Sequence, residues 1–138
     1  IASDNGAKNI LLDHIDTRAL NDTYTDLGLP NPDKATNYTI SPKQYSLLLR
    51  VLYNATYLSR QYSEKALQIL SRGEYKEALV AGVPAGITVA QKFGEHVDTD
   101  NATGAVTVTL SNCGIIYNPK IAYVLSVMVK GPDVPSLT

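Results

Sequence analysis

The chain has few of the residue types that usually mark a disulfide-stapled, metal-binding or membrane protein. Its one cysteine, Cys113, excludes an internal disulfide framework. Its two histidines, His14 and His96, leave little for a metal site, so we predict no metal and no other cofactor. No apolar run approaches the ~20 residues that a membrane-spanning helix requires. We therefore expect no transmembrane segment.

An excess of either charge is also absent. The 12 basic and 13 acidic residues give a formal net charge of −1, which argues against a nucleic-acid partner. Of the 138 residues, 44% are apolar and only 18% are charged, so the chain can bury a core. The length is that of about one domain, since domains typically run to ~100–150 residues.

The sequence divides into two kinds of pattern, which predict an α+β fold. Residues 1–85 read as a helical lobe and residues 86–131 as antiparallel strands, followed by a tail over residues 132–138. Helices followed by a run of strands predict a helical lobe beside a three-stranded antiparallel sheet. We expect the two parts to form one incomplete domain rather than two domains.

Capping residues mark the expected helix starts. Asp4 or Asn5 precedes the first helix, and Thr17 is expected to cap a second helix that ends at Gly28. Ser41 followed by Pro42 is the clearest start in the chain. Ser59 opens a fourth helix through Leu70, for which apolar spacing predicts four inward-facing side chains. These are Tyr62, Ala66, Ile69 and Leu70.

After residue 86 the hydrophobic period changes to two. A first strand is expected over residues 88–92, and the polar residues 95–104 are expected to form a loop. The alternating stretch 105–117 and the nearly all-apolar stretch 122–129 predict a hairpin. Because it is so apolar, we expect 122–129 to be the central strand.

Two short motifs stand out for their chemistry. Ser3-Asp4-Asn5 lies at the start of the first expected helix, and Lys92-Phe93-Gly94 lies at the end of the first expected strand. Each has an ordinary structural interpretation when taken alone. The first suits a helix cap, and the second suits a strand that ends at a bend.

Together and in this order, the motifs resemble those of the penicillin-recognising serine acyl-transferases, which use Ser-x-x-Lys, then Ser-Asp-Asn, then Lys-Thr-Gly. Class A β-lactamases and D,D-peptidases share this scheme. The stretches 26–29, 41–42, 82–86 and 112–117 are also similar to that pattern. The resemblance covers residues 3 to 131 and implies a partial β-lactamase/transpeptidase-like fold. It also implies a bacterial cell-envelope or otherwise extracytoplasmic location.

The resemblance implies roles for individual residues. Ser3 would relay a proton towards the leaving nitrogen of the substrate. Lys92 would place positive charge near Ser3 and the substrate carboxylate, in the strong class of charge-assisted hydrogen bonds. Asn5 would hydrogen-bond the substrate amide, whereas Asp4 would pin the loop. The implied substrate or ligand is a peptidoglycan-type peptide or a β-lactam.

The strand motif has further implied roles and one departure. Gly94 would let the substrate lie along the strand edge. The backbone N–H of Glu95 would form the strand half of the oxyanion hole. Phe93 stands where the family usually has a threonine or serine whose hydroxyl contacts the substrate carboxylate. We expect its ring either to pack on an apolar substrate group or simply to fill the site.

The largest departure is that no Ser-x-x-Lys motif occurs in the chain. None of the residues three positions before a lysine is serine; they are Asn5, Asn31, Ile40, Tyr62, Gly73, Val89, Tyr117 and Val127. The nucleophile would then lie in a missing N-terminal portion. We therefore expect the chain to be part of a domain about twice as long. We expect this part to be inactive on its own. Its partner would be that missing segment or a second copy of the chain.

A further departure concerns the loop over residues 27–40. Class A β-lactamases carry a glutamate there that activates the deacylating water, and this chain has none in that stretch. Asp33 is its only carboxylate and suits a turn better than a base. A peptidase-like or penicillin-binding role therefore fits better than efficient β-lactam hydrolysis.

Three further residues and two alternative functions complete the predictions. His14 is expected to be a surface residue, His96 to border the site, and Cys113 to be a small buried hydrophobe. The leading hypothesis is a portion of a serine hydrolase. One alternative is a non-catalytic member of the fold that binds cell-wall peptide or a protein partner. Another is a small domain that completes its sheet by dimerisation.

Overall fold

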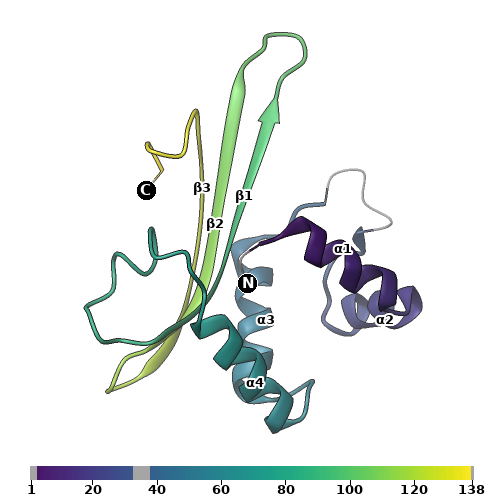
Figure 1. The fold of residues 1–138 in the computed structure, drawn as a ribbon, viewed down its shortest axis with the longest axis vertical. Coiled ribbons are helices and arrows are strands. Elements are labelled where there is room, and N and C mark those ends of the chain that lie inside the picture. The colour runs from purple at the N-terminus through teal and green to yellow at the C-terminus, as the bar shows by residue number, and fades with distance from the viewer. Residues whose placement is uncertain (1–2, 33–37, 138) are drawn as a thin grey trace.

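A computed structural model describes residues 3–32 and 38–137 of the chain (Figure 1). In these residues four helices precede three strands, which confirms the predicted α+β order. The helices are α1 (Asn5–His14), α2 (Thr17–Asp26), α3 (Pro42–Asn54) and α4 (Arg60–Ser71). The strands are β1 (Val89–Thr99), β2 (Val106–Tyr117) and β3 (Ala122–Gly131).

Local capping explains where the helices begin. The Asp4 carboxylate accepts a hydrogen bond from the Ala7 N–H at 2.8 Å. Ser41 and Gln44 form a reciprocal capping box in front of α3, with Pro42 in the first turn. The prediction of Thr17 as a cap is wrong by one residue, because the Asp16 carboxylate accepts from the Arg18 N–H and makes Asp16 the N-cap.

The sheet is antiparallel with strand order β1-β2-β3, so β2 is its central strand. The prediction that 122–129 is central is therefore wrong for the described part of the chain. β3 is instead an edge strand, and several of its apolar side chains are half-exposed. Tyr123 is 45% exposed, and Leu125 and Val127 are each 41% exposed. A nearly all-apolar strand indicates burial on two faces, and the described residues supply that cover only in part.

The first strand is longer than predicted. β1 pairs with β2 from Val89 opposite Ile116 to Thr99 opposite Val106, so residues 95–99 are strand rather than loop. The turn is confined to residues 100–105, where the Asp100 carboxylate accepts from the Ala102 and Thr103 N–H groups. Cross-strand pairing decides the conformation here, and it overrides the low strand propensity of the polar residues.

The main core lies between the sheet and the two helices that cover one of its faces, α3 and α4 (Figure 1). Leu49 of α3 packs with Cys113 and Ile115 of β2, all three nearly inaccessible to solvent. A smaller cluster of Leu79, Val89 and Ile116 forms on the opposite face. Cys113 is thus the small buried hydrophobe that we predicted.

The inward face of α4 differs from the prediction at two positions. Tyr62 is 62% exposed and Ile69 is 43% exposed, whereas Ser63 is buried. Leu67 and Leu70 are the residues of α4 that pack on the core. The reason is that α4 packs against both β1 and α3. These contacts, and not the apolar spacing alone, decide which side of the helix is buried.

The apolar side of α1 is open to solvent. Ile10, Leu11, Leu12 and Ile15 are all at least 44% exposed, and no residue of α1 is buried. Figure 1 shows α1 and α2 to one side of the helices that cover the sheet, with α1 beginning beside β1. α1 therefore begins close to β1, while α1 itself stays exposed.

Candidate functional site

The two sequence motifs, 89 residues apart, meet in the structure. The Lys92 ammonium donates a hydrogen bond to the Ser3 hydroxyl, with 2.5 Å between Nζ and Oγ. The same ammonium also donates to the backbone carbonyl of Phe93. Burial lowers the pKa of Lys92 below its ordinary value, because the charged ammonium loses hydration.

Ser3 reaches Lys92 from the segment that enters α1. Its backbone has a φ of 57°, in the left-handed region that non-glycine residues seldom adopt. Ala55 and Ala78 share this conformation, so it is not by itself a mark of the site. Asp4 then caps the helix, as the structural interpretation of the motif requires, and Asn5 is its exposed first residue.

The side chains of β1 alternate between two faces of the sheet. Lys92 lies opposite Cys113, which belongs to the core under α3, so Lys92 faces the helical layer. Phe93 faces the other way and its ring stacks on that of Tyr75, with centroids 3.8 Å apart and planes at 15°. The Phe93 ring thus lies across the sheet from the Lys92 side chain, and its carbonyl is the group that meets the ammonium.

The hydrogen-bond alternation of β1 identifies the groups at its outer edge. The Tyr117 N–H donates to the Thr88 carbonyl at 3.0 Å, so residue 88 and every second residue after it point their backbone groups at β2. The continuous register then directs the backbone groups of Phe93 and Glu95 outward. Among the described residues no strand pairs with that edge, so the Glu95 N–H is placed at an open edge.

Gly94 has a structural requirement at its position. A Cβ atom there would lie 2.9 Å from the Ser111 hydroxyl oxygen of β2. That hydroxyl donates to the Gly94 carbonyl at 3.3 Å. Close packing between β1 and β2 thus favours glycine here, separately from any contact with a substrate.

A cavity of about 660 Å³ continues from this region along the same face of the sheet. His96, which we expected to border the site, lines it together with Asp98 and Lys130. The His96 imidazole lies 3.0 Å from the Asp98 carboxylate. His14 lies elsewhere, at the end of α1, where its ring contacts the Ile10 carbonyl at 2.7 Å.

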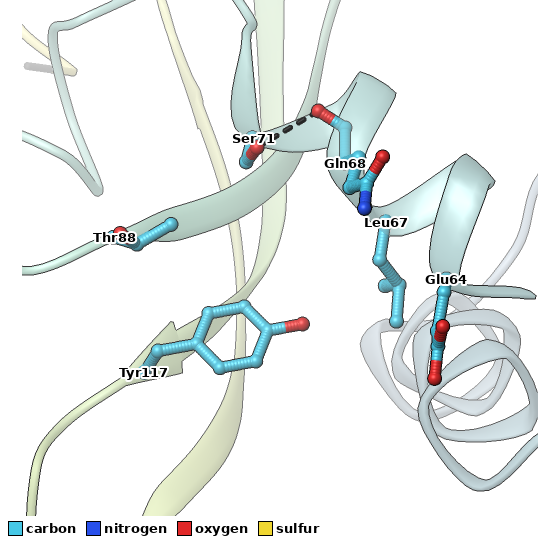
Figure 2. Close-up of a pocket in the computed structure, with 6 residues that line it drawn as sticks. All are labelled: Glu64, Leu67, Gln68, Ser71, Thr88 and Tyr117. Atoms are coloured by element: carbon cyan, nitrogen blue, oxygen red, sulfur yellow. Dashed lines mark hydrogen bonds between the residues drawn. The ribbon is translucent and has the colours of Figure 1, made fainter.

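A separate cavity of about 400 Å³ lies between α4 and the sheet (Figure 2). It contains none of the residues predicted for the site, and it is lined by Glu64, Leu67, Gln68, Ser71, Thr88 and Tyr117. In Figure 2 the Tyr117 ring points across it towards Leu67 of α4. Its lining supplies one carboxylate and no cation, so it offers no second arrangement like that of Lys92 and Ser3.

In residues 3–32 and 38–137, no group of three or more histidine, cysteine, aspartate or glutamate side chains could hold a metal ion. Over the same residues, no helix has both the length and the apolarity to cross a lipid bilayer.

Sequence reasoning missed one residue of the site, Tyr45. Its hydroxyl donates to the Lys92 carbonyl at 2.8 Å. The Tyr45 ring packs on the Leu49 cluster, as an apolar helix position would. No pattern in the sequence signals a hydrogen bond between a helix and a strand across 47 residues.

Comparison with known proteins agrees with the fold. The family profile Beta-lactamase2, described as "Beta-lactamase enzyme family", matches residues 1–137. The structure of PBP-A is similar with a TM-score of 0.68 and 25% identity, over 93% of this chain and 48% of that one. A mutant of PBP-A, solved as an acyl-enzyme complex with penicillin G, is similar with a TM-score of 0.68, 26% identity and the same coverage.

A β-lactamase from Sphaerobacter thermophilus DSM 20745 has the same fold. Its TM-score is 0.71 at 21% identity, over 94% of this chain and 50% of that one. No curated protein matches the chain. The chain therefore spans about half the length of the solved structures that it resembles.

Proposed function

This chain belongs to the β-lactamase enzyme family, and from that premise we propose that it carries the Ser-Asp-Asn and Lys-Phe-Gly half of a serine acyl-transferase. The whole protein would act on D-alanyl peptides or related amides outside the cytoplasm, and it would bind penicillins. The observation that carries the proposal is the hydrogen bond between Lys92 and Ser3, two motif residues 89 positions apart.

The chemistry follows from the positions of these groups. A nucleophilic serine from the rest of the protein would give its proton to a base there and attack the substrate carbonyl. Ser3 would relay a proton to the leaving nitrogen as the C–N bond breaks. Lys92, as a cation beside Ser3, would favour that transfer and attract the substrate carboxylate. Asn5 would bond the substrate amide, and the outward N–H of Glu95 would stabilise the developing oxyanion.

A slowly released acyl-enzyme is the expected outcome with a penicillin. Hydrolysis needs a base for the deacylating water, and the four glutamates of the chain, Glu64, Glu74, Glu77 and Glu95, all lie outside the loop 27–40. Asp33 lies outside the described residues. The lack of a glutamate supports a peptidase-like or penicillin-binding protein over an efficient β-lactamase.

Chain beyond these residues would also cover the face of the sheet opposite α3. Asn112 of β2 is buried, and both polar atoms of its side-chain amide have no hydrogen-bond partner in the described structure. It lines a hollow of about 220 Å³ with Phe93, Leu110 and Val127, on the face opposite α3. An unsatisfied buried amide beside apolar surface supports the presence of a partner that covers this face. We propose that the partner is the N-terminal segment of the same protein, with a second copy of this chain as the alternative.

The test is covalent labelling of the full-length protein by a fluorescent penicillin. We expect one penicillin per protein, bound to a serine in a Ser-x-x-Lys motif and released slowly. The 138-residue chain alone is the matched control and should not react. A full-length protein that has Ser-x-x-Lys and an accessible site, yet takes up no label, would contradict the proposal.

A second candidate function is a non-catalytic binder of cell-wall peptide. Two observations favour it: the Phe93 ring replaces the usual hydroxyl and stacks on Tyr75, and the loop lacks a glutamate. The sequence of the full-length protein separates the two functions. A Ser-x-x-Lys motif there supports the enzyme, and its absence together with binding of D-alanyl peptide supports the binder.

A further inference from the structure

Tyr45 links the helical layer to the lysine of the site. It lies in the first turn of α3, and its hydroxyl donates to the Lys92 carbonyl at 2.8 Å. Its ring packs on the Leu49, Cys113 and Ile115 cluster. The hydroxyl is thus held at its position by the core.

The hydroxyl of Tyr45 acts as a donor and not as a base. Burial raises the pKa of Tyr45 to about 12, with a smaller contribution from Cys113. The phenol therefore keeps its proton at neutral pH and has a carbonyl to receive the hydrogen bond. A role in taking protons from a substrate is excluded by that geometry, because the O–H is already directed at the backbone.

The Lys92 carbonyl points at β2 in the alternation described above, so the Tyr45 hydroxyl bonds to it from the helical side. A carbonyl oxygen has two lone pairs and can accept both bonds. The preceding residue is also held, since the Gln91 side-chain amide donates to the Tyr75 carbonyl at 2.5 Å on the opposite face. Two consecutive residues of β1 are therefore fixed from both faces of the sheet.

We propose that Tyr45 is a positioning residue, which fixes the Lys92 peptide so that the ammonium meets Ser3. The proposal rests on the function proposed above, in which Lys92 works as a cation beside Ser3. Tyr45 touches neither Ser3 nor the ammonium and acts only through the backbone of Lys92. It therefore belongs to the support of the site rather than to its reacting groups.

The test is Tyr45→Phe in the full-length protein, because this change removes the hydroxyl and keeps the ring in the core. The matched control is Tyr57→Phe, which removes a hydroxyl that bonds Thr23 and Asp26 away from Lys92. Acylation by fluorescent penicillin should become about tenfold slower in Tyr45→Phe, the loss expected for one hydrogen bond. The control should react at the wild-type rate.

A second readout follows Lys92 itself and needs no enzyme activity. Competitive acetylation of lysines at a series of pH values, read by mass spectrometry, gives the pH at which Lys92 loses its proton. A freed β1 peptide lets water reach the ammonium, so this midpoint should rise in Tyr45→Phe towards the ordinary lysine value of 10.5. The titratable groups around Lys92 include the Tyr45 phenol, the Cys113 thiol opposite Lys92 and the Asp4 carboxylate next to Ser3.

The outcomes separate this proposal from the function on which it rests. Slower acylation together with a raised Lys92 midpoint supports both. A wild-type protein that takes no penicillin contradicts the proposed function, and the midpoint shift then still decides the role of Tyr45. An unchanged midpoint in folded Tyr45→Phe overturns the positioning role, and so does an acylation rate equal to that of the control.

Discussion

At the β1 edge of the sheet, the Tyr45 hydroxyl of α3 donates to the Lys92 carbonyl, and the Gln91 side chain of β1 donates to the Tyr75 carbonyl before the strand. Lys92 also bonds to Ser3. On β3, by contrast, Tyr123, Leu125 and Val127 remain half-exposed, although β1 and β3 are both edge strands of the described sheet. One edge is organised by polar contacts within the chain, whereas the other presents apolar surface that the chain does not cover. The difference fits our proposal that β1 presents the site and that β3 packs against the rest of the protein.

The largest effect is expected from the polar edge. Lys92→Ala in the full-length protein removes the ammonium that bonds Ser3 and should slow penicillin acylation by ~10²–10³-fold, as the loss of a charge-stabilising donor does. Lys120→Ala, in the exposed turn between β2 and β3, is the matched control and should leave the rate unchanged. Stopped-flow quenching or gel fluorescence measures both. Equal rates for the two variants would exclude a role for Lys92.

The pH dependence of acylation should report the same lysine. Because burial lowers the pKa of Lys92, the ammonium is lost at a lower pH than that of an exposed lysine. A group that works as a cation is active below its pKa, so the rate should fall as the pH rises through that lowered value. The pH profile of acylation measures the midpoint. A rate that stays constant up to the ordinary lysine value of 10.5 would contradict this assignment.

The apolar edge is tested by burying a charge. Leu125→Lys on β3 should destabilise the full-length protein by about 3 kcal/mol if this face is covered there, since an unpaired buried charge is costly. Val97→Lys at the far end of β1 is the matched control, because it is also about half-exposed and should change stability by less than ~0.5 kcal/mol. Urea unfolding gives both values. A similar small effect for both variants would mean that β3 stays exposed.

Local signals made part of this molecule predictable. The starts of α1, α3 and α4 are fixed by the side chains of Asp4, Ser41 and Ser59. Each accepts a hydrogen bond from the backbone N–H three residues later, so the sequence alone locates them. The pairing of Ser3 with Lys92 was predictable only through the resemblance of two motifs. Neither the composition nor the spacing of these residues would have brought them together.

Non-local pairing explains what could not be predicted. Residues 95–99 are polar and read as a loop, yet their pairing with β2 makes them strand. Ser63 of α4 is buried while Tyr62 is exposed, because contacts with β1 and α3 choose the face of the helix. The bond from Tyr45 to Lys92 likewise exists only after α3 has packed on the sheet.

The smallest expected effect concerns the close approach between β1 and β2 at the polar edge. Gly94→Ala would place a Cβ 2.9 Å from the Ser111 hydroxyl oxygen and should cost about 1–2 kcal/mol of stability. Ser111→Ala removes that oxygen, so the double variant should recover most of the loss in a double-mutant cycle. Recovery of stability without recovery of penicillin acylation would separate two requirements for glycine. The first is packing against Ser111, and the second is access of a substrate to the outer edge of β1.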